Sequence, residues 1–234
     1  MTFCRGRVHF CLLVAIALGS ALLVAQAPEQ SSSSHSPKHI KKPASELNAE
    51  IDPGAVSGGV YHNKALGLAC KIPAGWVMRT EEMNAREEGS DATESKASPQ
   101  GAQRDTEDKR AGQVLLAAFS RPPEARGEEV NSSLLIVVES TAAYPGLKEA
   151  AQYFGPLKEV TKAQGFVEDE EPYEIALDGK TLVRADFHKD VGSRMMRQST
   201  LAFLARGYAV SITVIGGTED EVEELIDGIS FSGK

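Results

Sequence analysis

The chain has 234 residues, of which 41% are hydrophobic and 25% are charged, so its length allows one domain or two small ones. The formal net charge of −8 argues against nucleic acid or anionic lipid as the main partner and favours a soluble, acidic surface. The sequence shows no internal repeat, and we expect one folded domain over residues 57–234.

The first 27 residues have the pattern of an export signal. Arg5 and Arg7 form a basic start, Cys11–Ala25 is an apolar run, and Ala25–Ala27 is an A-x-A cleavage motif. The apolar run is shorter than the roughly 20 residues that a membrane-spanning helix needs. We therefore expect cleavage after Ala27 and a periplasmic or secreted protein without stable membrane insertion. An uncleaved N-terminal anchor is the alternative.

Two polar segments lack the periodicity of a folded element. Residues 28–56 are rich in serine, proline and lysine and predict a flexible linker, in which His35 and His39 could suggest a metal site but lie in an unstructured context. Residues 81–111 contain Met83 as their one large apolar residue. This segment cannot bury enough surface to offset the entropy of ordering, so we predict a disordered insertion, with a docking segment as the alternative.

Strand patterns follow the linker. Residues 60–62 and 66–72 predict two strands, and a Pro73–Gly75 turn precedes the single tryptophan, Trp76. We interpret Trp76 as a packing anchor, with a ligand-stacking platform as the alternative. Signal cleavage would leave Cys70 as a lone cysteine in an apolar strand, which favours a buried, inert thiol.

The middle of the chain combines further strands with a helix. Residues 113–119 and 134–139 are apolar and predict central strands, and residues 147–164 have helical spacing that Gly155-Pro156 is expected to interrupt. The Asp178-Gly179 pair predicts a hairpin between the strands 173–177 and 181–188. A further strand, 195–205, should follow.

The segment 206–231 carries the clearest pattern. Residues 208–214 alternate as a strand, Thr218 and Glu221 have capping-box spacing, and Gly228 is placed to end the helix before a last short strand. The glycines before Thr218 could hold an anion on backbone amides, but the acidic residues 219–221 already crowd that position. The acidic run 168–171 lacks the ligand spacing of a calcium loop and is interpreted as a solvated edge.

None of the usual nucleophile, metal, phosphate or dinucleotide motifs is present, so we expect no enzyme activity and no cofactor. The most suggestive polar set is Arg184, Asp186 and His188 on one strand face, with Asp190 just beyond. An acid beside a histidine could tune a proton-transfer group. The alternative is a solvent-facing ladder with ion pairs to the arginines of the next strand, Arg194 and Arg197.

The chain resembles the PsbP/Mog-type sandwich family. The resemblance rests on the strand of residues 60–63, the glycine-bearing strand 66–68, the turn 73–76 and the closing segment 206–231. It implies an α+β fold in one domain, an α/β/α sandwich whose antiparallel sheet has helices on both faces. It also implies a non-catalytic accessory or binding protein.

We therefore expect an exported accessory protein that binds another extracytoplasmic protein through the sheet or the insertion. One alternative is a carrier that binds a small apolar ligand between sheet and helices. A second is a hydrolase that uses Asp186 and His188. The candidate surface comprises Trp76, Arg184, Asp186, His188 and Asp190.

Overall fold

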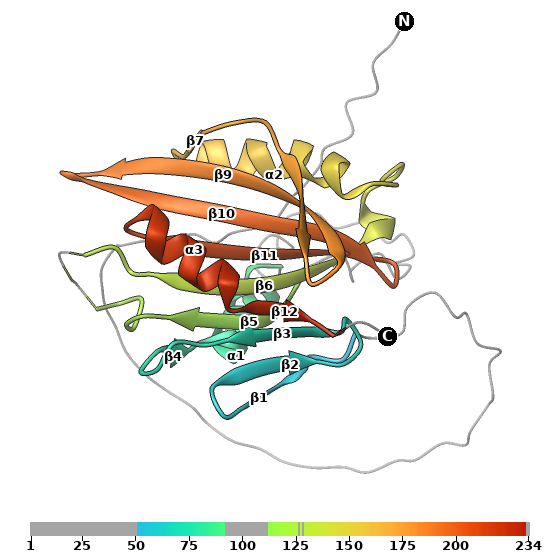
Figure 1. The fold of residues 1–234 in the computed structure, drawn as a ribbon, viewed down its shortest axis with the longest axis horizontal. Coiled ribbons are helices and arrows are strands. Elements are labelled where there is room, and N and C mark those ends of the chain that lie inside the picture. Colours follow the sequence, from blue (N-terminus) through green and yellow to red (C-terminus); the bar gives the residue numbers. More distant parts are fainter. Residues whose placement is uncertain (1–50, 92–111, 126, 128, 233–234) are drawn as a thin grey trace, which may run out of the picture.

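The computed structural model describes residues 51–91, 112–125, 127 and 129–232. These residues form two sheets, and Figure 1 shows the smaller one beside the larger. The smaller sheet has four strands in the order β1 (Ala55–Ser57), β2 (Val60–Asn63), β3 (Leu68–Lys71) and β12 (Ile229–Phe231). The end of the described chain therefore pairs with one of its first strands.

The larger sheet has eight strands, and all its pairings are antiparallel. Its order is β4 (Val77–Met78), β5 (Gln113–Phe119), β6 (Ser133–Ser140), β11 (Tyr208–Gly216), β10 (Arg194–Ala205), β9 (Lys180–Val191) and β7 (Val167–Glu168). The remaining strand, β8 (Tyr173–Leu177), also pairs with β9 through the predicted Asp178-Gly179 hairpin. The short connections between β8, β9, β10 and β11 make each strand antiparallel to the next.

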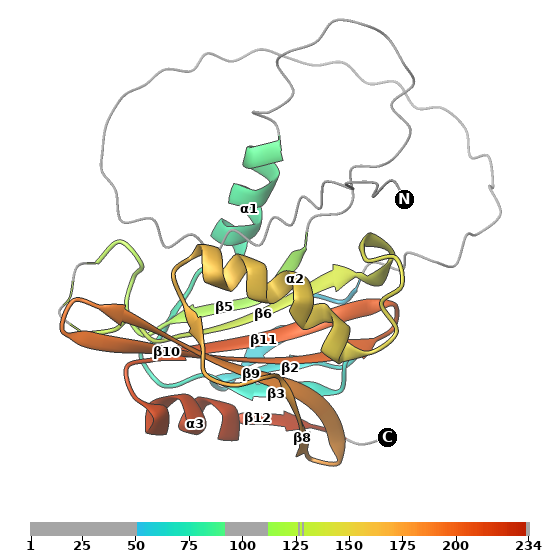
Figure 2. The same cartoon turned by 90° about the horizontal axis from the view of Figure 1, so that it is seen from above.

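Three α-helices complete the described fold. They are α1 (Thr80–Asp91), α2 (Ala150–Ala163) and α3 (Glu219–Asp227), and a single 3₁₀ turn, η1 (Thr141–Ala143), follows β6. Figure 2 shows α1 and α2 on one side of the large sheet, with α3 and the small sheet on the other. We call these two sides the helix face and the sandwich face.

The sandwich face carries one continuous core. Side chains at alternate positions of the central strands point to it, among them Leu201, Val210 and Ile212, and all three are buried. They pack against the small sheet and against the apolar stripe of α3, which includes Leu225. This layer buries the larger part of the core.

The helix face carries two separate clusters. In one, Phe154 and Leu157 of α2 pack on Ala185 and Phe187 of β9 and on neighbouring strands. In the other, Met83 of α1 packs against an apolar cluster on β5 and β6, which comprises Val114, Ala117, Phe119 and Val137. The strip of sheet between the two clusters is therefore covered by neither.

The predicted α/β/α sandwich is wrong. The described residues form twelve strands but only three α-helices, and the structure is a β-rich fold with two sheets. One face of the large sheet is covered mainly by a second sheet, to which α3 is added, rather than by a helical layer. The four short strands β1, β2, β3 and β12 form that second sheet, and their patterns are too short to predict how they pair.

The predicted insertion also differs at its beginning. Residues 80–91 form α1, which is held on β5 because the Asn84 amide donates to the Val114 carbonyl and accepts from the Val114 amide, both at 2.9 Å. Residues 92–111 lie outside the described part of the chain, as do the export signal and residues 28–50 of the predicted linker 28–56. The end of that linker is folded, because Ile51 is buried and residues 55–56 belong to β1.

Gly155-Pro156 does not interrupt α2, which runs continuously through the proline. Proline removes one helical hydrogen bond at a cost of about 3 kcal/mol. Burial of Tyr153, Phe154 and Leu157 against the sheet offsets that cost.

The closing segment confirms the sequence analysis. The Thr218 side chain accepts a hydrogen bond from the Glu221 amide as the N-cap of α3, and Gly228 ends the helix before β12. The strand β11 also places Val210, Ile212 and Val214 on one buried face, as predicted.

Thr218→Ala should lower the free energy of unfolding by about 1 kcal/mol, because α3 loses its side-chain cap. Thr218→Ser retains the hydroxyl, so its free energy of unfolding should stay close to that of the native protein. Urea unfolding followed by circular dichroism measures both, and equal losses in the two variants would contradict the capping role.

Candidate functional site

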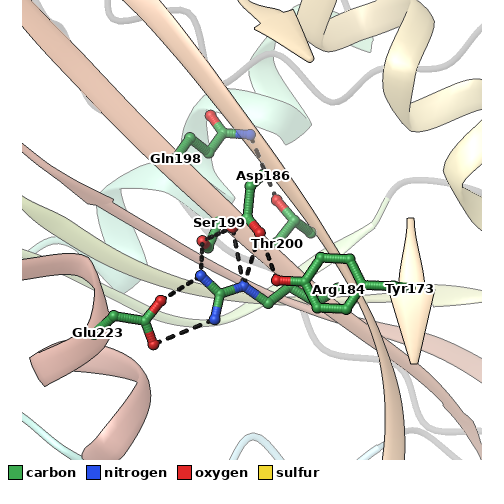
Figure 3. A network of polar contacts seen from close by, with 7 residues as sticks. All are labelled: Tyr173, Arg184, Asp186, Gln198, Ser199, Thr200 and Glu223. Atoms are coloured by element: carbon green, nitrogen blue, oxygen red, sulfur yellow. Dashed lines mark hydrogen bonds and ion pairs between the residues drawn. The ribbon is translucent and has the colours of Figure 1, made fainter. Parts of the chain in front are cut away.

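The predicted polar face of β9 exists, and it lies on the sandwich face next to α3 (Figure 3). The Arg184 Nε donates to both carboxylate oxygens of Asp186, at 2.9 and 3.0 Å. Its two terminal nitrogens donate to the Glu223 carboxylate of α3, at 2.5 and 3.3 Å. Burial disfavours the charge, but the hydrogen bonds to Glu223 and Asp186 prevail and raise the pKa of Arg184 above its ordinary value. The arginine thus ties α3 to the large sheet.

The Asp186 carboxylate is held from two further strands. The Tyr173 hydroxyl of β8 donates to its Oδ2 at 2.8 Å, and the Ser199 hydroxyl of β10 donates to its Oδ1. Burial, with the hydrogen bond to Asp186, raises the pKa of Tyr173 to about 12. Since Arg184, Tyr173 and Ser199 all donate to this carboxylate, we interpret the network as a structural clamp.

His188 does not join this clamp. Its Nδ1 contacts the Asp169 carboxylate, in the segment after β7, rather than Asp186. The acid–histidine pair on which the hydrolase hypothesis depended is therefore not formed. The ladder interpretation is also wrong about partners, because no ion pair within the described ranges joins this face to Arg194 or Arg197. Asp190 is exposed near the end of β9.

Two other predicted features are structural. Trp76 is half-buried and packs against the sandwich-face core, which confirms its interpretation as a packing anchor. Cys70 is fully buried, and burial raises the pKa of its thiol to about 12, which agrees with an inert cysteine.

The two weak ion-binding patterns have internal partners. The Gly217 amide at the start of α3 donates to the Glu221 carboxylate at 2.8 Å, so a side chain of the helix itself occupies the expected anion position. Glu168 and Glu171 of the acidic run both pair with Lys158 of α2. Within the described ranges, no group of three or more His, Cys, Asp or Glu side chains could hold a metal ion.

A groove with a volume of about 580 Å³ lies on the helix face. Leu157 and Val160 of α2 form one wall, and Leu135 and Ile215 lie on the sheet opposite. The groove occupies the uncovered strip between the α1 and α2 clusters. It ends at Phe166 and the β9–β10 hairpin, whose lining residues are Lys189, Asp190, Val191, Gly192 and Met196.

The groove floor is polar in the middle. Gln198, Ser211 and Thr213 line it from β10 and β11. The Gln198 amide donates to the Thr200 hydroxyl at 3.4 Å, and the Thr200 and Thr213 hydroxyls are 3.1 Å apart. Gln198 and Thr213 thus each contact the Thr200 hydroxyl, and Ser211 hydrogen-bonds to Tyr153 of α2. An apolar molecule on the floor would therefore not leave all of these polar groups unpaired.

A buried carboxyl group marks the helix face beyond the groove. Glu139 follows Leu135 and Val137 on the same side of β6, and it accepts hydrogen bonds from the hydroxyls of Tyr144, at 2.9 Å, and Tyr153. Burial raises the pKa of Glu139, whereas the two tyrosine hydrogen bonds act in the opposite direction. Because Tyr153 belongs to α2, this contact fixes the first half of the helix on the sheet.

The sequence raised a ligand site between sheet and helices as an alternative but identified none of the residues on the groove floor. Ser211 and Thr213 alternate with buried Val210 and Ile212, and this alternation was interpreted only as a strand pattern. In the structure this face lies partly beneath α2 and partly along the groove. No helix of the described residues is long and apolar enough to cross a membrane.

No protein-family model matches this chain, and no curated protein matches it. The resemblance to the PsbP/Mog family therefore stays a prediction, as does protein binding through the sheet surface.

Three solved structures are similar at a low level. A protein of unknown function from Pseudomonas aeruginosa, PA94, is 17% identical over 51% of this chain and 77% of that chain, with a TM-score of 0.33. LpqN, involved in cell envelope biogenesis of Mycobacterium tuberculosis, is 11% identical over 71% of this chain and 83% of that chain, with a TM-score of 0.34. A protein from Bacteroides thetaiotaomicron is 8% identical over 71% of this chain and 46% of that chain, with a TM-score of 0.33. Similarities of this size carry no functional inference.

Arg184→Met should lower the free energy of unfolding by about 2 kcal/mol, because Asp186 and Glu223 lose their shared cation. Removal of one partner from a fully buried pair costs roughly 3–5 kcal/mol, but Glu223 is 45% exposed and regains water. Arg197→Met, two strand positions from Ser199, is the matched control and should change stability little. If Arg184→Met lowered the free energy of unfolding no more than Arg197→Met does, the stabilising role of the clamp would be contradicted.

Glu139→Gln should change how stability depends on pH. Burial raises the pKa of Glu139 from its ordinary value of 4.5. The contribution of Glu139 to the free energy of unfolding is therefore complete below about pH 4.5 and decreases as pH rises through the folded-state pKa. We expect the difference in unfolding free energy to move in favour of the variant between pH 4.5 and 8. Urea unfolding across this range measures it, with exposed Glu159→Gln as the control. A difference that stays constant with pH would count against a buried, ionisable Glu139.

Proposed function

We propose that this protein is an exported, non-enzymatic carrier that binds a small apolar or amphipathic ligand in the groove between α2 and the large sheet. The observation that carries the proposal is the groove itself. Its volume of about 580 Å³ falls within the roughly 300–1,000 Å³ of ligand sites in proteins. Its walls are largely aliphatic, and most of its polar side chains lie on the floor and at one end.

The way in which the helix face is packed supports this function. Phe154 and Leu157 anchor α2 at one side of the groove, and Met83 anchors α1 at the other. Each helix has its own apolar cluster, so an empty groove does not require either helix to collapse onto the other. A ligand that enters the groove would bury apolar walls such as Val160 and Ile215, and this burial supplies the binding free energy.

The proposed chemistry is binding rather than catalysis. The side chains that line the groove within the described residues are aliphatic, amide and hydroxyl groups with one phenylalanine, one methionine, one lysine and one aspartate. On the opposite face, Asp186 is engaged by Arg184, Tyr173 and Ser199. Export is proposed from the signal pattern of residues 1–27.

Val160→Trp should fill the groove and weaken ligand binding about tenfold or more, the effect expected from overpacking of roughly 1–3 kcal/mol. The neutral dye N-phenyl-1-naphthylamine is the probe, and its displacement by decanol reports occupancy. Glu159→Trp is the matched control, because the neighbouring side chain is exposed and does not line the groove. Absence of dye and decanol binding by the native protein, or equal effects of the two variants, would refute the proposal.

A further inference from the structure

One charged side chain is placed at the end of the groove. Lys189 lies near the end of β9 on the helix face, two positions from Phe187, and it is half-buried. Its Nζ donates to the Gln164 carbonyl after α2 at 2.6 Å and lies 5.7 Å from the centre of the Phe166 ring. The segment that follows α2 therefore holds this ammonium group in place.

The ammonium group keeps donors for a ligand. A lysine has three N–H donors, and the contact with Gln164 uses one of them. Within the described ranges, none of the ion pairs involves Lys189. The neighbouring Asp190 is exposed and also lines this end of the groove, where it forms no ion pair with Lys189. A positive charge thus faces the groove beside apolar walls.

Among the described residues, the rest of the groove lining offers no second cation. Its lining contains Lys189 and Asp190 as the charged residues, and Lys158 of α2 is already paired with Glu168 and Glu171. A ligand with an anionic group at one end and an aliphatic chain would match this distribution of charge. Its chain would lie along Val160 and Leu135, and its anionic group would accept hydrogen bonds from Lys189.

We propose that the ligand class is a single-chain aliphatic carboxylic acid, whose carboxylate binds Lys189 while its chain occupies the groove. This inference rests on the proposed carrier function and adds the identity of the headgroup. The acidic protein as a whole repels anions, so the preference must come from the local position of Lys189.

Displacement of N-phenyl-1-naphthylamine by decanoate, decanol and decylamine at pH 8 tests the headgroup. The native protein should bind decanoate about tenfold more tightly than decanol, since a hydrogen bond to a charged group is worth roughly 1.5–3 kcal/mol. Decylamine should bind most weakly. Lys189→Gln should bind decanoate and decanol alike, and Lys189→Arg should retain the preference.

Lys162→Gln is the matched control, because it removes an exposed lysine from the last turn of α2 without touching the groove lining. It should leave the preference for decanoate intact. The proposed binding of a carboxylate to Lys189 would be refuted if the native protein bound decanoate and decanol equally, or if the preference for decanoate persisted in Lys189→Gln. Either result would leave the proposed carrier function unaffected. If none of the three compounds displaces the dye, both proposals fail.

Discussion

The central strands of the large sheet have two faces to cover, and the two faces are covered differently. On the sandwich face, Leu201, Val210 and Ile212 meet a second sheet and α3 in one continuous core. On the helix face, α1 and α2 are each anchored by their own cluster. A single helix is only about 10–12 Å wide, so two helices docked at separate places cannot cover an eight-stranded sheet. The groove follows from this mismatch.

The polar networks divide between the same two faces. The Arg184 clamp joins β8, β9, β10 and α3, and it fixes the sandwich layer away from the groove. The Glu139 contact with Tyr153 fixes one half of α2 on the sheet, and Lys189 meets the other end of that helix at Gln164. The helix is therefore held at both ends while its side, at Val160, faces the groove. This arrangement is suited to a preformed ligand site.

Much of the fold could be predicted from local patterns. The strands β5, β8, β9 and β11, the Asp178-Gly179 hairpin and the cap at Thr218 all follow from spacing within a few residues. The second sheet could not be predicted, because β12 pairs with β3 from the opposite end of the domain. The continuous α2 could not be predicted either, since tertiary burial of Phe154 and Leu157 outweighs the local effect of Pro156.

The candidate site was less accessible to sequence reasoning than the fold. Arg184, Asp186 and His188 were correctly placed on one strand face, but their partners Glu223 and Asp169 come from other elements. The groove depends on where helices dock, and alternating polar residues on β11 look the same in a solvated face and in a groove floor. Lys189 could not be identified as a candidate binding residue from the sequence, because its contacts with Gln164 and Phe166 form only in the folded chain.

The proposed carrier function requires that a ligand occupies the groove on the helix face. Nuclear Overhauser effects between decanoate and the methyl groups of the protein test this most directly. We expect contacts from the decanoate chain to Leu135, Val160 and Ile215, and none to Val222 or Leu225 of α3 on the sandwich face. Contacts to the α3 methyl groups, without contacts to the groove, would contradict it.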